Sequence, residues 1–383
     1  MTRRKKTTAI VTSLLENKAL PGRLVLLGVA SGKRVRLTQL ARSQAGLPPA
    51  EVLEWRDWLA APGKLGGMLA HSCVFKVEPP GDDPAVQARL LADGCLAEGI
   101  ANPGSLEHGE LAVSGAWFKG LERALLRLEQ QVANMPHVRV MNAPRETILM
   151  TDKLACQHHL AKHKVAVPAV LGMVEGYDHF HSLLDQHGLD RVFIKTRYGS
   201  SASGVVAYRR NRRGGEQATT SAQLVHGTGA IRLYNSKRMS RYHLAADIRT
   251  LVDLLASQQA YAEGWLPKPR AGNGHYDIRV LTLGGQPAHR VARIGKCMMT
   301  NLHLDNRRGA ADSLLDPASQ EALEKVARQA AQAFPASHVI GLDVVAQRGE
   351  AHVLEANAFG DLLPGLLWQE QDTYTAQWKS FLQ

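Results

Sequence analysis

Apolar runs and turn residues alternate along the first third of the chain in a pattern typical of α/β folds. Gly22–Ala30 is an apolar run ending in small residues, and it predicts a short buried strand. Lys33–Ala45 spaces its apolar residues as a helix does, and Gly46 with the two prolines that follow ends it. Strand, glycine turn and helix in this order predict the beginning of a Rossmann-like α/β unit.

The same unit continues to about Arg139. We expect a strand over Ser72–Val77 and helices over Val86–Leu96 and Ser114–Ala133. A second unit begins near Asn142, where Thr151 or Asp152 is placed to cap a helix that runs to Lys164. The segment Val165–Val170, which contains Pro168, follows this helix. Further along, we expect an exposed hydrophilic excursion over Arg209–Ser221, a helix over Leu244–Leu255 and an edge strand over Gln259–Leu266.

A loop of small residues lies between two predicted strands in Arg191–Arg210. Lys195 ends the first of these strands, and Gly199–Gly204 contains only glycine, serine and alanine. Small residues let backbone N–H groups approach a polyphosphate closely, and a lysine adds a point charge. An earlier P-loop candidate at Gly32–Lys33 is rejected, because Arg34 stands where that motif needs Ser or Thr.

The last third of the chain predicts two hairpins joined by a helix. Tyr276–Leu283 and Ala288–Ile294 flank a Gly-Gly turn, and a helix over Pro317–Phe334, capped by Asp316, leads to a second strand pair within Val339–Asn357. The first hairpin carries polar residues on both of its strands, namely Asp277, Arg279, Arg290 and Arg293.

The second hairpin carries candidate metal ligands. Glu355 and Asn357 are two residues apart, so their side chains point to the same face of a strand. Asp343 joins them on that face if the two runs pair. Three oxygen ligands of this kind suit Mg²⁺ shared with substrate phosphates. Taken alone, the segment is also compatible with an ordinary hairpin that has acidic ends. Clustered carboxylates repel one another, so we expect neutralising one to leave the ligand-free protein as stable or more stable.

Composition excludes several classes of protein. The 383 residues exceed one typical core and predict two or three domains. No apolar run reaches the roughly 20 residues that a membrane span needs. The basic N-terminus lacks the apolar core of a secretory signal, and the four cysteines form no CxxC pair. A cytoplasmic protein without structural disulfides or a zinc cluster is therefore expected.

The net charge of +11 indicates either an anionic partner or a charged, solvent-exposed loop. Much of the excess lies in Arg3–Lys6 and in Arg191–Arg241. The basic run lacks the interleaved aromatic residues of an RNA-binding motif, and no helix-turn-helix or zinc-finger spacing occurs. We therefore consider nucleic acid an unlikely partner and favour a solvated loop near an anionic ligand. Arg307 and Arg308 suggest an anionic small molecule or peptide as substrate.

The ordered set of these features resembles the ATP-grasp superfamily over about Asn142 to Gly365. The set runs from the helix-leading Lys153 through Lys195 and its loop to the polar hairpin, an Asn-x-His loop and the Asp343…Glu355-x-Asn357 pattern. The resemblance is nearest to the branch of ribosomal-protein glutamate ligases and D-alanine–D-alanine ligases. It implies an α/β ATP-grasp fold with a Rossmann-like pre-ATP-grasp domain at 1–140, an N-terminal subdomain with the phosphate lid at 141–262, and a C-terminal subdomain with the Mg²⁺ site at 263–383.

The resemblance also implies roles for particular residues. Lys153 and Lys195 would bind the α- and β-phosphates of ATP, Glu263 and the backbone near Leu266 the adenine, and Asp277 would lie near the ribose. The loop residues Ser200, Ser201, Ser203 and Gly204 would close over the phosphates. Asp343, Glu355 and Asn357 would bind Mg²⁺ or Mn²⁺. Arg293 and Arg279 would contact the transferring phosphoryl group and the substrate carboxylate.

Plainer roles remain open for several of these residues. Lys153 is compatible with a solvated helix start, Glu263 with an exposed strand edge, and Arg279 and Arg290 with a polar strand face. His303 either orients Asn301 or caps a loop. The segment after Asn357 departs from the pattern of the glutamate ligases, so the acceptor stays open.

The implied activity is an ATP- and Mg²⁺-dependent carboxylate–amine or carboxylate–thiol ligase that works through an acylphosphate. The alternatives are an ATP-grasp kinase that phosphorylates a hydroxyl, and a nucleotide- or nucleic-acid-binding protein without turnover. The sequence does not indicate the two substrates or the oligomeric state.

Overall fold

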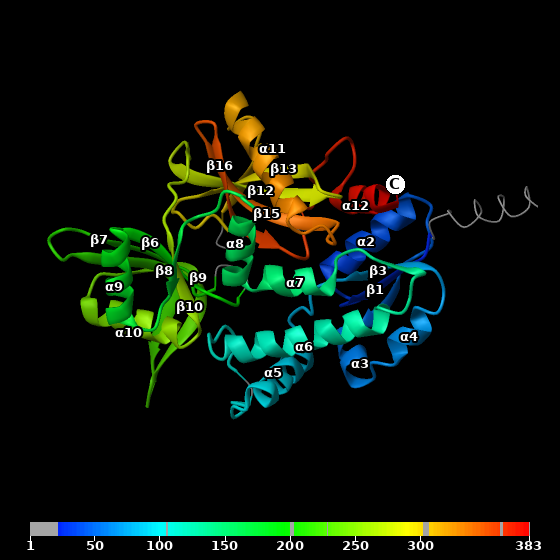
Figure 1. Cartoon of the computed structure of the whole chain (residues 1–383), viewed down its shortest axis with the longest axis horizontal. Coiled ribbons are helices and arrows are strands. Elements are labelled where there is room, and N and C mark those ends of the chain that lie inside the picture. Colours follow the sequence, from blue (N-terminus) through cyan, green and yellow to red (C-terminus); the bar gives the residue numbers. More distant parts are fainter. Residues whose placement is uncertain are drawn as a thin grey trace, which may run out of the picture.

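The computed structural model describes residues 22–104, 106–199, 203–227, 229–301, 306–360 and 363–382. Three β-sheets lie in these ranges (Figure 1). The first sheet, with its helices, forms one end of the molecule; the second lies at the opposite end, and the third lies between and above them, with α7 (Pro144–Thr151) and α8 (Lys153–Lys162) at the centre.

The first sheet is parallel and has the strand order β2-β1-β3-β4. It consists of β1 (Leu24–Gly28), β2 (Glu51–Glu54), β3 (Cys73–Val77) and β4 (Val138–Val140), with helices α2 (Lys33–Gln44), α3 (Trp55–Ala60), α4 (Lys64–Met68), α5 (Pro84–Glu98) and α6 (Ser114–Val132). Every residue of β1 and β3 is buried, because Leu24 and Leu26 pack on the side of α2 while Val25 and Leu27 pack towards α3, α5 and α6. The predicted α/β unit is confirmed; the short strands β2 and β4 were not predicted.

The second sheet is antiparallel and has the order β5-β10-β6-β7-β8-β9. Its strands are β5 (Val170–Met173), β6 (Arg191–Thr196), β7 (Val206–Arg210), β8 (Glu216–His226), β9 (Ile231–Tyr242) and β10 (Ala260–Gly264), and α9 (Tyr177–His187) and α10 (Ala245–Ala256) pack against them.

Two expectations for this sheet are wrong. The strand expected at the edge, Gln259–Leu266, is β10 and lies between β5 and β6, so its side chains are buried. The expected hydrophilic excursion at Arg209–Ser221 is mostly strand, with Ala218, Thr220 and Ser221 fully buried in β8. The charged residues around the turn hid a strand of small and β-branched residues. Strand β5, which begins at Val170, was not predicted.

The third sheet is antiparallel, with the order β14-β13-β12-β15-β16 and a short strand β11 beside β12. Its strands are β11 (Arg270–Ala271), β12 (Gly274–Leu283), β13 (Gln286–Gly295), β14 (Arg307–Gly309), β15 (Val339–Gln347) and β16 (Glu350–Asn357). Helix α11 (Pro317–Gln332) covers it, with Asp316 accepting the N–H of Ser319 as its cap, and α12 (Thr373–Leu382) packs on α2. Both predicted hairpins are confirmed.

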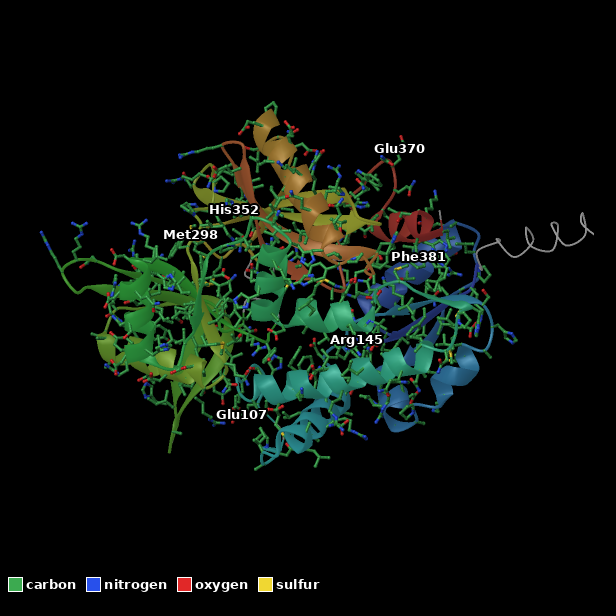
Figure 2. The ribbon with its side chains drawn as sticks, viewed as in Figure 1. Glu107, Arg145, Met298, His352, Glu370 and Phe381 are labelled. Carbon is green, nitrogen blue, oxygen red and sulfur yellow. The ribbon has the colours of Figure 1, made fainter. Side chains whose placement is uncertain are left out.

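A loop between α5 and α6 joins the first unit to the second sheet. We call residues 106–113 the bridging loop. The N–H of Leu111 donates to the Leu233 carbonyl (2.8 Å), and the N–H of Asn235 donates to the Gly109 carbonyl (2.7 Å). The loop residue Glu107, labelled in Figure 2, accepts hydrogen bonds from Arg232 and Tyr234 of β9. The bridging loop is therefore an added strand-like edge on β9.

Within the described residues, no helix has both the length and the apolar character that a membrane crossing requires.

Helices α5 and α6 cross at two glycines, and this close contact generates a prediction. A Cβ added at Gly120 would overlap the backbone carbonyl of Leu90, and one added at Gly94 would overlap that of Ala116. Gly120→Ala should therefore cost about 3 kcal/mol of unfolding free energy, because neither helix backbone can yield easily. Gly66→Ala in α4 is the control, since nothing lies within 4 Å of its added Cβ. Chemical denaturation measures both, and equal effects would contradict the close crossing.

Candidate active site

A cavity of about 880 Å³ lies where the three sheets meet. Ligand pockets commonly have volumes of about 300–1,000 Å³. The first unit contributes Arg34, the segment 79–82 and parts of α5 and α6; the second sheet contributes Thr196, Gly199 and Ser203; the third contributes Arg279, Arg293, Asn301, Glu355 and Asn357. Lys153, at the start of α8, also lines it.

The β15–β16 hairpin brings the three predicted metal ligands to neighbouring positions. Asp343 lies opposite Glu355, and Gly341 lies opposite Asn357, whose side-chain N–H donates to the Gly341 carbonyl (3.1 Å). Glu355 and Asn357 line the cavity. Asp343 is only 3% exposed and lies behind them. The described residues contain no group of three His, Cys, Asp or Glu side chains arranged to hold a metal.

Asp343 is held between two arginines. Arg293 Nη2 lies 2.9 Å from one carboxylate oxygen, and Arg279 binds the other. The expectation that the carboxylates repel one another is therefore wrong for this structure. Basic side chains from β12, β13 and α8 pair with Asp343 and Glu355, and the sequence alone did not show that these side chains are neighbours.

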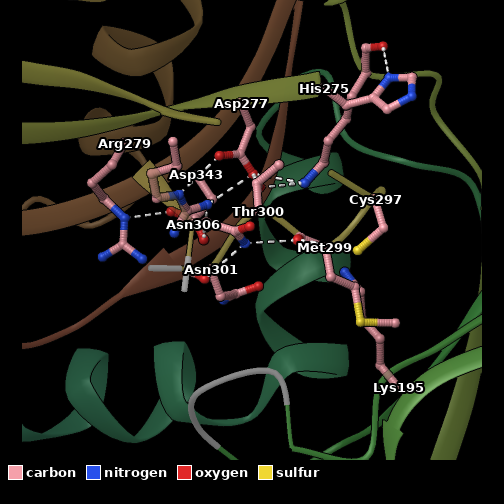
Figure 3. A network of polar contacts seen from close by, with 12 residues as sticks. Lys195, His275, Asp277, Arg279, Cys297, Met299, Thr300, Asn301, Asn306 and Asp343 are labelled. Atoms are coloured by element: carbon pink, nitrogen blue, oxygen red, sulfur yellow. Dashed lines mark hydrogen bonds and ion pairs between the residues drawn. The ribbon is translucent and has the colours of Figure 1, made fainter. Parts of the chain in front are cut away.

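A second carboxylate, Asp277, binds the same guanidinium of Arg293. Its two oxygens accept hydrogen bonds from Arg293 Nε and Nη2 (both 2.8 Å), from Lys268 Nζ (2.8 Å) and from Thr300 Oγ1 (2.7 Å) (Figure 3). Burial raises the pKa of the Asp277 carboxyl, but Arg293 and Lys268 more than offset this, so the pKa is lowered. Burial lowers the pKa of Arg293, and Asp277 and Asp343 together reverse that effect, so the pKa is raised. Asp277 and Arg293 are thus both held in their charged forms.

The two predicted phosphate-binding lysines each pair with a carboxylate. Lys153 binds Glu355, and Lys195 binds Glu263. Burial raises the pKa of Glu355, but Lys153, with Lys195 and Arg279 behind it, lowers it overall to about 2. Asp152 caps α8 through the N–H of Ala155 and also binds Arg197 (2.6 Å), so the helix start that carries Lys153 is anchored.

The predicted nucleotide residues are not all gathered at the cavity. Glu263 is 1% exposed, contacts Lys195 and Tyr261, and does not line the cavity, nor does Leu266. The alternative of an exposed strand edge for Glu263 is therefore wrong, while its adenine role stays a prediction. Asp277 is likewise buried and lies beneath the cavity wall.

The predicted phosphate loop is described only in part. Ser200, Ser201 and also His303 lie outside the described residues. Gly204 has φ +68°, and a Cβ there would approach Thr196, so the turn requires glycine. Thr196 Oγ1 donates to the Ser203 carbonyl (3.2 Å), which ties Ser203 to the end of β6.

Three site residues were missed by the sequence interpretation. Lys268 and Thr300 complete the shell of Asp277. Arg34 lines the cavity and donates to the Phe359 carbonyl (2.7 Å), two residues beyond Asn357. Its place at the start of α2 after a glycine turn was a signal for an anion-facing residue. Arg307 and Arg308, by contrast, are exposed on β14 and do not line the cavity, so the observation behind the expected anionic substrate does not belong to this site.

Comparison with known proteins finds no match among protein-family models or curated proteins. Solved structures do match. The chain is similar to D-cycloserine synthetase DcsG (15% identity, 94% of this chain and 100% of that one, TM-score 0.52). It is also similar to the ADP complex of PurK, N5-carboxyaminoimidazole ribonucleotide synthetase (13% identity, 94% and 77%, TM-score 0.56). A weaker match is D-alanine–D-alanine ligase from Bacillus anthracis with ATP (13% identity, 94% and 90%, TM-score 0.43). The first two confirm the fold that the sequence predicts.

The arginine clamp on Asp343 predicts that this residue stabilises the ligand-free protein. Asp343→Asn should cost about 3 kcal/mol of unfolding free energy, because Arg279 and Arg293 lose a buried partner. Asp312→Asn is the control: its carboxylate is 61% exposed and also binds an arginine, Arg290. A loss below about 1 kcal/mol is expected there. Denaturation without nucleotide or metal measures both, and an unchanged or raised stability in Asp343→Asn would disprove the clamp.

The Lys153–Glu355 pair predicts a particular acid sensitivity. The pKa of Glu355 falls from its ordinary value of 4.5 to about 2 on folding, so the pair contributes its full stability above pH 4.5 and loses it towards pH 2. The difference in unfolding free energy between the wild type and Glu355→Gln should therefore shrink across that window. Denaturant titrations at a series of pH values measure it. A difference independent of pH would show that the ion pair does not form.

Proposed function

We propose that this chain, which has the ATP-grasp fold, is an ATP- and Mg²⁺-dependent ligase. It would activate a carboxylate as an acylphosphate with release of ADP, and then join the acyl group to an amine or a thiol with release of phosphate and a proton. One observation carries the proposal: Lys153, Arg279 and Arg293 line the same cavity as Glu355 and Asn357. Cations for phosphate oxygens and oxygen ligands for a metal thus face one space.

The donor set fits a hard divalent cation. Glu355 is 30% exposed to the cavity, and Asn357 offers an amide oxygen beside it. These two residues would hold Mg²⁺, with Asp343 joining if Arg279 turns away from it. When bound, the ion supplies positive charge to the phosphate oxygens. The same donor set also accepts Mn²⁺.

In the ligand-free protein, each member of an ion pair would occupy the place that a ligand group takes in the bound state. Lys153 neutralises Glu355 in the absence of metal, and Glu355 neutralises Lys153 in the absence of phosphate. We expect Mg-ATP to replace both partners at once. Lys195 and Glu263 form a second pair of the same kind. The charges of these two pairs then have partners in either state, which keeps the free energy needed to empty the site small.

Arg293 would act as a fixed charge at the reacting centre. Asp277 and Asp343 both bind its guanidinium, so it needs little reorganisation as charge moves onto the transferring phosphoryl oxygens. Arg279, on the neighbouring strand, would hold the substrate carboxylate. In this scheme no side chain forms a covalent intermediate.

Trapping of the activated acid tests this function. With ATP, Mg²⁺ and a carboxylate substrate, hydroxylamine should intercept an acylphosphate as a hydroxamate, with one ADP formed for each hydroxamate. Lys153→Ala should lower this rate at least about tenfold, because a cation at the phosphates is lost. Arg290→Ala is the control, since Arg290 binds Asp312 and Glu324 and does not line the cavity. AMP as the nucleotide product would contradict the proposal, and a stable phosphate ester without hydroxamate would instead indicate a kinase.

A further inference from the structure

We propose that the carboxylic acid substrate has an apolar body, and that Leu106, Trp117 and Leu91 select it. The fate of the carboxylate rests on the ligase function, whereas the pocket rests on the residues that line the cavity. The acid would be a monocarboxylate with an aliphatic chain or one aromatic ring.

A small hydrophobic cluster stands at the cavity wall and adjoins the core of the first unit through Trp117, which packs against both. Its buried members are Leu91, Cys95 and Ala116, and the half-buried Leu106, Val113 and Trp117 pack against them. Leu91, Leu106 and Trp117 also line the cavity, as does Leu121 of α6. Leu106 and Trp117 thus present part of their apolar surface to the ligand space.

The charge on this wall argues against an acidic side chain. Among the described residues of the first unit that line the cavity, the acidic ones are Asp82 and Glu110 and the basic one is Arg34. Arg34 already binds the Phe359 carbonyl and lies 3.6 Å from the buried Glu78. A second carboxylate placed here would meet Asp82, Glu110, which lies 3.7 Å from Arg232, and one engaged guanidinium.

The part of the cavity wall formed by α8 and the third sheet supplies the complement. It includes Lys153, Arg279 and Arg293, together with Glu355 and Asn357. A ligand with one carboxylate and an apolar body matches both parts of the wall: its charged group meets the basic residues where activation takes place, and its body covers Leu106 and Trp117. Each buried methylene then strengthens binding about fourfold.

Ligand binding to the full-length protein tests the pocket without requiring turnover. With Mg²⁺ and a non-hydrolysable ATP analogue present, phenylpropanoate and hexanoate should raise the melting temperature, whereas glutamate and succinate at the same concentration should not. From butyrate to hexanoate, affinity should rise about 16-fold. Stabilisation by glutamate or succinate alone, or by none of the four acids, would overturn the proposal.

Two leucines of the same unit supply a matched pair of variants. Leu106→Glu places a charge at the pocket and should abolish the response to phenylpropanoate, and Leu106→Ala should weaken it. Leu96→Glu introduces the same charge at a leucine that is 80% exposed and outside the cavity, so its response should equal that of the wild type. Equal responses in Leu106→Glu and Leu96→Glu would overturn the assignment of the pocket.

Product analysis separates this proposal from the ligase function. Hydroxamate and ADP formed from phenylpropanoate, with a lower KM than from glutamate, support both. Binding of phenylpropanoate that depends on Leu106 but yields no hydroxamate would support the apolar pocket and overturn the ligase. Hydroxamate formed preferentially from glutamate would support the ligase and overturn the apolar pocket.

Discussion

The buried bond between Asp277 and Arg293 is the constraint on which the candidate site depends. A guanidinium that is only 4% exposed needs carboxylates beside it, and Asp277 and Asp343 supply them from adjacent strands of one sheet. Because Arg293 is fixed, Asp343 is fixed, and the hairpin then places Glu355 and Asn357 at the cavity. Lys268 and Thr300 complete the shell of Asp277 and tie the loops before β12 and after β13 to the same centre.

Each charge that would face a ligand already has a partner of opposite charge in the ligand-free protein. The pairs Lys153–Glu355 and Lys195–Glu263 join elements far apart in the chain, so they also hold α8 against β16 and β6 against β10. An isolated buried charge would cost several kcal/mol, about as much as a small domain has to spare. The charged residues proposed to bind the ligand would therefore also stabilise the folded protein through their mutual ion pairs, until a ligand replaces those partners.

The sequence predicted those parts of the fold that local pattern determines. Apolar and polar residues alternate in the two strands around Gly284 and Gly285, and Asp316 caps α11. This hairpin and this helix could therefore be predicted from the sequence. The shared face of Glu355 and Asn357 followed from the two-residue period of a strand, whereas the place of Asp343 opposite Glu355 depended on the pairing of the two strands, which the structure shows. Strand β8 was missed because its small and polar residues carry no apolar alternation, although Thr220 and Ser221 are fully buried. The place of β10 inside its sheet depends on pairing with β5 and β6, which no local pattern reveals. The same holds for Arg34, whose partner Phe359 lies 325 positions away, and for the basic side chains that separate the acidic ones.

The bridging loop makes the two halves of the ligand space thermodynamically dependent on one another. Leu106 belongs to the cavity wall, while Glu107, Gly109 and Leu111 are bonded to β9 of the sheet whose inner strands carry Lys195 and Glu263. Any rigid rotation of that sheet must carry Leu106 with it or break those bonds. An occupant of one half that biases the rotation therefore biases affinity in the other half, and by the same factor in each direction. The order in which two ligands arrive would then change the path taken but not the total free energy of filling the site.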